Sequence, residues 1–236
     1  MIRTLLHLAI AAALAGCTAP PAYLPKDVPV SVTAPQAKLG DYWEYALRDG
    51  YTGIPWGIYR YEVTQIEANR VIVTVTNDGR TVDRLVYAAG WNGRELPVTP
   101  LVRFRYEPSY EAYSYPLEPG KTWKAVSNST DVATGKHYRT YVYGKVVGWE
   151  HIRVPAGEFD ALKVERKAFA GNMEGYQTQE EIIETDWYVP SVRRAVLTRR
   201  SSQHFDTSRG GGDGGGEYPL RIRGDYLIGE LVAYSR

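Results

Sequence analysis

The feature that most constrains the fold is a two-residue alternation of side chains that recurs along the chain. Residues 71–76 place valine at every second position, and Asn-Asp-Gly at 77–79 supplies a turn. Residues 81–87 then have the composition of a returning strand. Because successive side chains of a strand point to opposite faces, this pattern predicts an antiparallel hairpin. No segment after residue 17 keeps an apolar period of 3.6 residues, so the sequence predicts an all-β protein.

Similar runs predict more strands. They lie at 59–64, 101–106, 138–147, 149–154, 159–167, 176–189, 192–200 and 227–234. We expect residues 149–154 either to continue the strand at 138–147 or to bend it at Gly148. Prolines interrupt residues 91–119, so we expect loops there with one short strand at 101–106. Short helical turns are alternatives at 41–47 and 180–185.

Composition agrees with this class. The chain has 19 Tyr, 6 Trp and 23 Gly, which favour strands and tight turns. The tetrapeptide G-x-x-W occurs at 40–43 and again at 120–123, and alternating strands follow each copy. Either two similar halves build one large curved antiparallel sheet or partly open β-barrel, or the repeat is coincidental. The predicted β domain spans residues 39–236.

The N-terminus has the layout of an export signal. Arg3 precedes an apolar run that ends at Leu14, Ala15, Gly16 and Cys17. This ending resembles the lipobox of bacterial lipoproteins. The resemblance implies that residues 1–16 are a signal peptide, that cleavage falls between Gly16 and Cys17, and that the Cys17 thiol carries lipid, with acyl chains such as palmitate. An ordinary secretory signal is the alternative, whereas the run is short of the roughly 20 residues that span a bilayer.

Several expectations follow from the lipobox. The membrane is a partner through the lipid on Cys17, and more than one acyl chain is needed for stable anchoring. Thr18 follows the cysteine, which resembles the sorting pattern for an outer membrane facing the periplasm if the host is Gram-negative. Residues 17–38 contain five prolines and read as a semi-rigid tether or a disordered N-terminus. Cys17 is the sole cysteine, so its acylation excludes a disulfide.

Charge argues against nucleic acid as a partner. The full chain has 28 basic and 27 acidic residues, and loss of Arg3 with residues 1–16 makes the two equal. Binding to phosphate backbones requires an excess of positive charge. We therefore expect no nucleic-acid function.

We find no set of residues typical of an enzyme. His137, His151 and His204 lie in none of the usual zinc spacings, and G-x-S-x-G does not occur. Residues 210–215 match G-x-G-x-x-G only because glycine is abundant there. We expect no metal, no cofactor and no catalytic residues, so the chain is predicted not to be an enzyme.

One acidic run is a weaker candidate. Glu180, Glu181, Glu184 and Asp186 follow one another on a predicted strand. Glu180, Glu184 and Asp186 share a face, which could hold a cation or act in acid–base chemistry. A strand face turned to solvent is the interpretation we favour.

Four segments of the second half resemble a family. Residues 115–117 read YPL, 119–123 PGKTW, 154–164 VPAGEFDALKV and 187–190 WYVP. In this order they resemble bacterial exported proteins of the DUF3108-like (TapB) type, and the resemblance implies an antiparallel sheet curved toward a barrel. Arg193 stands where that family often has glycine, which puts the turn in doubt because arginine resists a positive φ.

Aromatic residues give the one hint of a ligand. On a curved sheet, inward rings could line a pocket for a lipid or another hydrophobic molecule, or fill the core, which we favour. The residues concerned are Tyr42, Trp43, Tyr45, Tyr51, Trp56, Tyr59 and Tyr61. We expect a lipid-anchored cell-envelope binding or scaffold module with a groove for a hydrophobic ligand. The alternative is a structural or protein-interaction lipoprotein without a small ligand, whose partner is another envelope protein.

Overall fold

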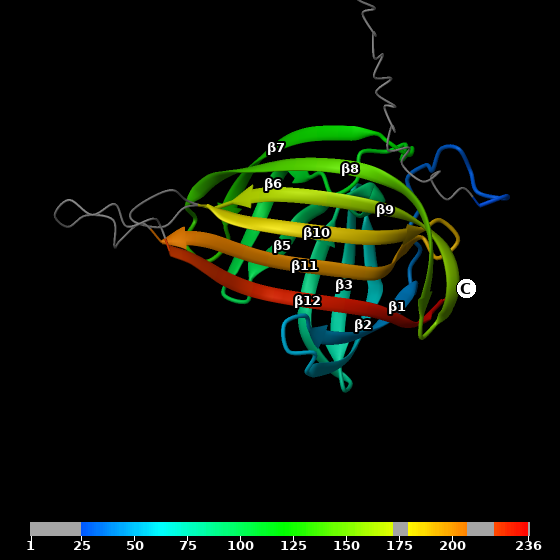
Figure 1. The fold of residues 1–236 in the computed structure, drawn as a ribbon. Coiled ribbons are helices and arrows are strands. Elements are labelled where there is room, and N and C mark those ends of the chain that lie inside the picture. The colour runs from blue at the N-terminus through cyan, green and yellow to red at the C-terminus, as the bar shows by residue number, and fades with distance from the viewer. Residues whose placement is uncertain (1–24, 172–178, 207–219, 236) are drawn as a thin grey trace, which may run out of the picture.

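The computed structural model describes residues 25–171, 179–206 and 220–235. Within them the chain forms twelve strands and one 3-10 turn (Figure 1). The elements are β1 (Tyr42–Asp49), β2 (Pro55–Glu67), β3 (Arg70–Asn77), β4 (Arg80–Tyr87), η1 (Ala89–Trp91), β5 (Gly93–Thr99), β6 (Val102–Tyr110), β7 (Thr122–Asp131), β8 (His137–Val154), β9 (Gly157–Ala170), β10 (Glu180–Val189), β11 (Arg194–Asp206) and β12 (Leu220–Tyr234).

The strands form a closed antiparallel barrel in simple up-and-down order. Each strand pairs with its neighbours in sequence, and β1 pairs with β12 from Trp43 opposite Tyr234 to Asp49 opposite Leu227. This last pairing leaves no free sheet edge between the first and last strands. The predicted all-β class and the curvature toward a barrel are confirmed, and the barrel is closed rather than partly open.

The region around residues 91–119 differs from its prediction. It holds two strands, β5 and β6, instead of one. Pro97 lies within β5 and Pro108 within β6, and β5 pairs with β4 at only two positions. Proline cannot donate a ladder hydrogen bond but tolerates an extended backbone, so a strand with sparse pairing can contain it.

The alternative of helical turns at 41–47 and 180–185 is wrong, since residues 42–47 and 180–185 lie in strands. In β1 the buried side chains are Trp43, Tyr45 and Leu47, with less buried residues between them. Spacing by two residues places all three on the inward face of the barrel. Pairing on both sides therefore outweighs any local helical preference.

Gly148 bends the longest strand as predicted. Strand β8 has 18 residues, and its register with β9 shifts between Val146 and Gly148. Gly148 has φ 155°, and the shift leaves Val147 without a partner across the ladder. A bulge of this kind increases local twist and lets a long strand follow the barrel wall.

The two G-x-x-W copies fold alike. Gly40 and Gly120 have φ of 82° and 85°, respectively. The amide of Gly40 donates to the carbonyl of Val63 at 2.9 Å, and the amide of Gly120 donates to the carbonyl of Val146 at 2.8 Å. Each glycine leads into the first strand of a six-strand half, β1–β6 or β7–β12. The shared geometry favours a structural repeat over coincidence.

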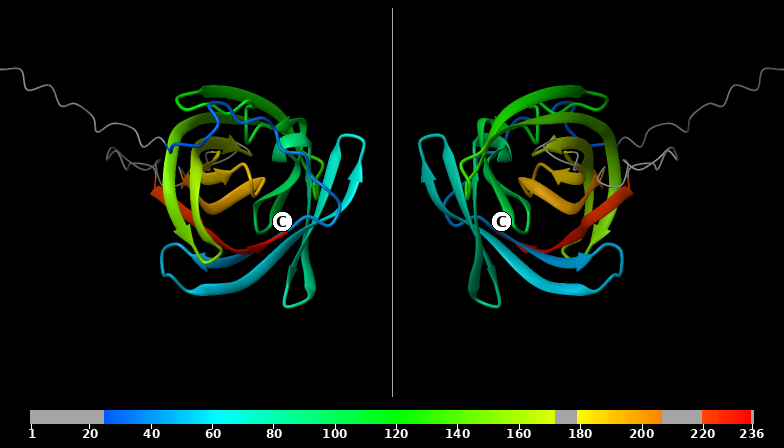
Figure 2. Two further views of the ribbon diagram at one scale, coloured as in Figure 1. Left: turned by 90° about the vertical axis from the view of Figure 1, so that its right-hand side faces the viewer. Right: turned by 90° about the vertical axis from the view of Figure 1, so that its left-hand side faces the viewer.

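The segment that precedes β1 crosses one end of the barrel, beside the β10–β11 turn (Figure 2). Val32 is buried and forms a two-way backbone bridge with Leu117. The part of the predicted tether from residue 25 to 38 therefore contacts the barrel. The signal peptide, the lipobox and Cys17 lie outside the described residues.

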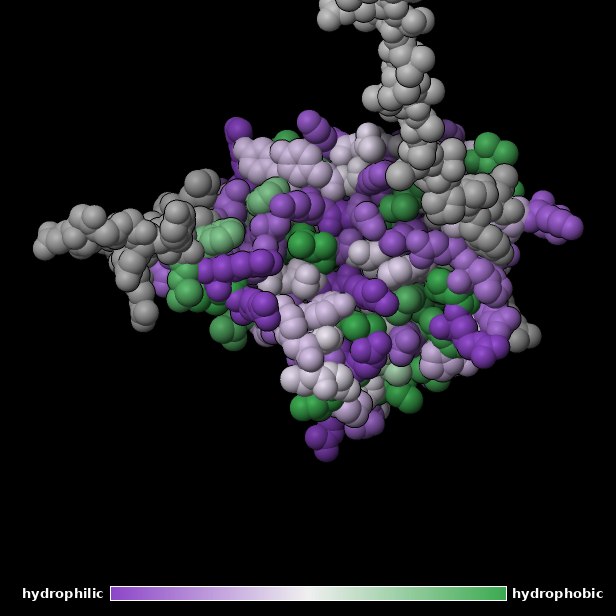
Figure 3. Space-filling model, viewed as in Figure 1, coloured by the Kyte–Doolittle hydropathy of each residue, from purple (hydrophilic) through white to green (hydrophobic). Residues whose placement is uncertain are grey.

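The outer face seen in Figure 3 mixes hydrophilic and hydrophobic side chains without a single dominant patch. Charged side chains pair on the outside of the barrel, as in the contacts of Arg60 with Glu44 of the neighbouring β1 and with Glu62 of its own strand β2. Among the described residues, no helix has the length and apolar character needed to cross a bilayer.

Candidate functional site

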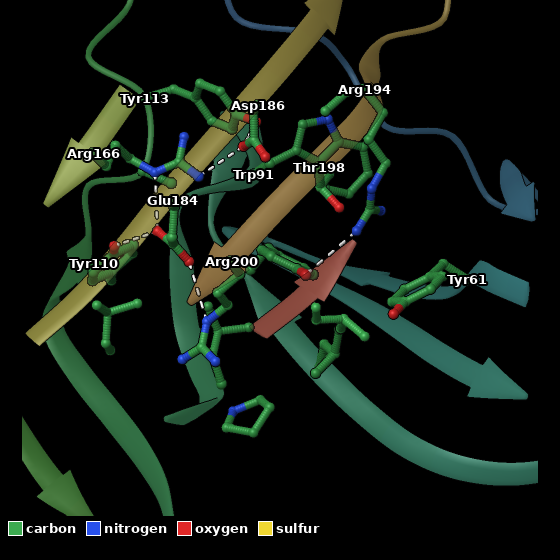
Figure 4. Close-up of a pocket in the computed structure, with 18 of the residues that line it drawn as sticks. Tyr61, Trp91, Tyr110, Tyr113, Arg166, Glu184, Asp186, Arg194, Thr198 and Arg200 are labelled. Carbon is green, nitrogen blue, oxygen red and sulfur yellow. Dashed lines mark hydrogen bonds and ion pairs between the residues drawn. The ribbon is translucent and has the colours of Figure 1, made fainter. Parts of the chain in front are cut away.

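The interior of the barrel holds a partly open cavity of about 270 Å³ (Figure 4). Side chains of β1, β2, β4, β5, β6, β9, β10, β11 and β12, together with Trp91 of η1 and the segment after β6, supply its walls. A strand presents alternate residues to one face, so every strand of a closed barrel contributes to a common interior. The site is thus assembled by barrel closure rather than by one local motif.

Tyrosine and tryptophan form one wall. The rings of Tyr45 and Tyr61 meet edge to face with centroids 5.5 Å apart, and Tyr87 and Trp91 meet similarly at 5.6 Å. The Tyr45 hydroxyl donates to the carbonyl of Ala195 at 2.6 Å. The Tyr61 hydroxyl has no hydrogen-bond partner within the described part of the chain. Burial raises the pKa of both Tyr45 and Tyr61 well above the usual value, so both hydroxyls stay protonated.

A buried ion network forms the opposite wall. The side chain of Arg166 is only 5% exposed; its Nε donates to Glu184 at 3.1 Å and its Nη2 donates to Asp186 at 2.7 Å. Tyr110 donates to Glu184 at 2.7 Å and Tyr113 donates to Asp186 at 2.5 Å. Each carboxylate therefore receives a charged and a neutral hydrogen bond, which compensates its loss of hydration.

Strand register creates this network. Glu184 of β10 lies directly opposite Arg166 of β9 and directly opposite Arg200 of β11. Arg200 approaches Glu184 at 3.4 Å and donates to the carbonyl of Val98 at 2.6 Å. Burial raises the pKa of Glu184, but the charges of Arg166 and Arg200 and the Tyr110 hydrogen bond outweigh it and hold that pKa below its usual range.

Arg194 differs from the other two interior arginines, because within the described residues it forms no ion pair. Its guanidinium lies near four rings, with its Cζ atom 4.8 to 5.6 Å from their centroids. The rings belong to Trp43, Tyr61, Tyr87 and Trp91. Nη2 lies 3.4 Å from the Tyr87 hydroxyl, and Nη1 is buried with no hydrogen-bond partner among the described residues.

The acidic run predicted from sequence lies partly in this site. Glu184 and Asp186 face the interior, so the preferred interpretation of a solvated strand face is wrong for both. Glu180 lies 3.3 Å from His204, and Glu181 contacts Lys167 at 2.5 Å. Closure of the barrel explains the difference, because it turns one face of β10 away from solvent.

The predicted aromatic residues lie in four different environments. Tyr45 and Tyr61 line the cavity, and Trp43 is fully buried beside Arg194. Tyr51 and Trp56 are about half exposed near the β1–β2 turn. The remaining two, Tyr42 and Tyr59, lie outside the cavity lining. Part of the group therefore lines a cavity and part fills the core, while binding of a hydrophobic ligand stays a prediction.

Metal binding finds no further support. Within the described ranges no cluster of three or more His, Cys, Asp or Glu side chains could hold a metal ion. None of His137, His151 or His204 lines the cavity. The carboxylates of Glu184 and Asp186 are already paired with arginine, which leaves them poor ligands for a cation.

Sequence reasoning missed Arg166, Arg194 and Arg200. A signal for Arg200 was present, because Thr198 and Arg200 are two residues apart and share one face of β11; a register shift at Val196 interrupts this alternation before Arg194. Arginines on a strand usually mark the solvent side. Here the pairing of Arg200 with Glu184 across β10 and β11 indicates the interior instead.

Comparisons with known proteins yield fold likeness alone. No family model matches the chain, and no curated protein matches it, so the DUF3108-like resemblance and the lipobox stay predictions. A proposed lipoprotein of Parabacteroides distasonis aligns over 86% of this chain and 99% of its own, with 17% identity and a TM-score of 0.47. A proposed exported protein of Bacteroides fragilis with a YmcC-like fold aligns over 87% and 100%, with 14% identity and a TM-score of 0.46. The hypothetical lipoprotein YmcC of Escherichia coli aligns over 84% and 86%, with 10% identity and a TM-score of 0.41.

Proposed function

We propose that this chain is a lipid-anchored binding protein of the bacterial cell envelope that holds a small ligand inside its barrel. The interior cavity carries the proposal. A core that served packing alone would be filled, because protein interiors tolerate few voids larger than a water molecule. This barrel instead surrounds about 270 Å³ with aromatic rings and oriented polar groups, the usual composition of a ligand site.

The size of the cavity limits the ligand. An apolar cavity of about 150 Å³ accepts benzene, which has six heavy atoms. In proportion, about 270 Å³ accepts a molecule of roughly 11 heavy atoms. This volume is too small for a diacyl lipid. We therefore expect the hydrophobic ligand to be a compact molecule and not a membrane lipid.

The proposed cellular location of the protein is inferred from its sequence. The lipobox Leu14-Ala15-Gly16-Cys17 supports acylation of Cys17, and Thr18 supports the outer membrane facing the periplasm as the destination. Replacement Cys17→Ala should abolish labelling by radioactive fatty acid and processing at Gly16. Labelling that persists in this variant would disprove the anchor while leaving the cavity untouched.

Native mass spectrometry tests the binding role. We expect the full chain with Cys17→Ala to carry a copurified small molecule. Ala112 lines the cavity and is 8% exposed, so Ala112→Phe should occupy that space and remove the adduct. Val126, 48% exposed, offers a matched control, and Val126→Phe should keep it.

The alternative function is structural, with an envelope protein as partner and no small ligand. It would be favoured if the chain shows no adduct and if crosslinking in cells captures one stable protein complex that survives Ala112→Phe. No residue of the cavity is needed for that role. Binding in the interior and docking at the outer face therefore respond to different substitutions.

A further inference from the structure

We propose that the cavity selects a small monoanion, a carboxylate on an aromatic or apolar body, and that Arg194 is its charge anchor. This inference rests on the proposed binding function and adds the chemistry of the ligand. It follows from Arg194, a half-buried cation of the cavity lining with no anionic partner among the described residues; Arg199, the other lining arginine without an ion pair there, is exposed to solvent.

The charges facing the interior do not balance. Arg166 and Arg200 share the two carboxylates of Glu184 and Asp186, through contacts of 2.7 to 3.4 Å. That group of four side chains is neutral. Arg194 adds one positive charge, which a guanidinium keeps at any physiological pH. A buried charge without a counter-ion is costly, so a single negative charge on a ligand would neutralise the excess positive charge of the interior.

The surroundings of Arg194 fit an anion with an apolar body. Four rings hold the guanidinium by cation–π contact, which offsets part of the burial cost and fixes its direction. Its Nη1 atom is buried with no partner, although the residue as a whole is half-buried. The same rings provide the surface on which an apolar or aromatic body would pack.

Neighbouring hydroxyls can complete the recognition of an oxyanion. Tyr61, whose ring centroid lies 5.3 Å from the Arg194 Cζ atom, has a hydroxyl that is protonated and without a partner in the described chain. Thr198 lines the cavity on the same strand as Arg194, as Figure 4 shows. A planar carboxylate suits the fork of an arginine, since it accepts two parallel hydrogen bonds.

Calorimetry with matched probes tests the inference on the full chain with Cys17→Ala. The probes are benzoate, phenylacetate and hexanoate, each compared with its neutral primary amide. We expect at least one carboxylate to bind at least 10-fold tighter than its amide. Arg194→Met should remove that preference, with little effect on the affinity for the amide, because it keeps an apolar side chain but deletes the charge.

Two further variants cover the case in which Arg194→Met does not fold. Arg194→Lys keeps the charge but loses the planar fork, and Tyr61→Phe deletes only one hydroxyl; each should weaken carboxylate binding several-fold. Arg60→Met is the control, because Arg60 also stacks on a ring, 3.7 Å from the Tyr42 centroid, but lies on the outer face. It should leave all affinities unchanged.

The outcomes separate the two proposals. Equal binding of acids and amides would overturn the anion inference and keep the binding function. Carboxylate preference that persists in Arg194→Met and Tyr61→Phe would also overturn it. Absence of binding by every probe, together with absence of a copurified adduct, would refute the inference and the proposed function together.

Discussion

Arg166→Met should be far more destabilising than the same change at Arg60. Both arginines bridge two carboxylates: Arg166 contacts Glu184 at 3.1 Å and Asp186 at 2.7 Å, and Arg60 contacts Glu62 at 2.9 Å and Glu44 at 3.0 Å. Their burial differs, because the Arg166 side chain is 5% exposed and the Arg60 side chain 35%. The pair therefore isolates the effect of burial.

The magnitude follows from what each change leaves behind. Arg166→Met removes two charged hydrogen bonds, each worth about 1.5–3 kcal/mol, and leaves Asp186 with the Tyr113 hydroxyl and Glu184 with Tyr110 and the 3.4 Å contact of Arg200. Breaking a buried ion pair costs about 3–5 kcal/mol, so we expect a loss of about 4 kcal/mol in the free energy of unfolding at pH 7. Arg60→Met leaves carboxylates that water can solvate, and we expect about 1 kcal/mol or less.

The pH dependence gives a second signature. In the protein, the pKa of Glu184 is lowered, so the stability it contributes is present above the unfolded pKa of about 4.3 and is lost as the pH falls through the folded pKa. In Arg166→Met, Glu184 loses the charge that most lowers its pKa while the burial that raises it remains, so we expect the pKa of Glu184 to rise above the unfolded value. The native variant then binds more protons than its unfolded chain, and its stability rises as the pH falls from 7 to 5.

Urea unfolding followed by circular dichroism measures these differences, with equal m-values as the check for two-state behaviour. As the pH falls from 7 to 5, the difference in the free energy of unfolding between the unmodified protein and Arg166→Met should decrease. The corresponding difference for Arg60→Met should stay small. Equal costs for both variants at pH 7, or a difference for Arg166→Met that does not change with pH, would refute the assignment of a buried network.

Three further predictions concern the backbone, the packing and the ligand. Gly40→Ala and Gly120→Ala should each cost about 1–2 kcal/mol in thermal or urea unfolding, because both residues have positive φ and neither added Cβ would meet another atom; unequal costs would contradict the repeat. Gly144→Ala should cost about 1–3 kcal/mol, because its Cβ would lie 2.1 Å from the Trp123 ring, and an unchanged unfolding midpoint would contradict this packing. Carboxylate affinity should be constant from pH 6 to 9 in calorimetry, since Arg194 does not titrate there; a histidine-like transition would show that another group binds the anion.

Local pattern was sufficient for much of the fold. The hairpin at 71–87 and the bend at Gly148 are confirmed, because turn residues and two-residue alternation act within a few positions. The doubt about Arg193 also identified a real constraint, since this arginine has φ 61°. Its guanidinium contacts Asp41 at 2.8 Å, and its carbonyl accepts a hydrogen bond from Trp91 at 2.6 Å. These contacts hold a conformation that glycine would adopt more easily.

The site could not be predicted in the same way, because it depends on which face of each strand the barrel encloses. In sequence, the charged positions of β10 and β11 look like a solvent face. Only closure through the β1–β12 pairing and the direct register of Glu184 with Arg166 and Arg200 turn them into an interior network. Register over several strands is a non-local property, and a one-residue slip would reverse every side chain.

With the proposed lipid on Cys17, the position of the cavity suggests a route by which a ligand would reach the site. The N-terminal segment crosses the end of the barrel near Arg193, where Val32 is fixed to Leu117. Arg200, 31% exposed, lies six residues along β11 from Arg194, about 20 Å away from that end at the rise of a strand. The 15 residues from Cys17 to Val32 reach at most about 50 Å, so an anchored barrel stays close to the membrane with its covered end on the side of the tether. The more exposed end then faces the aqueous compartment, and we expect the ligand to enter from water, as a small carboxylate would, rather than from the bilayer.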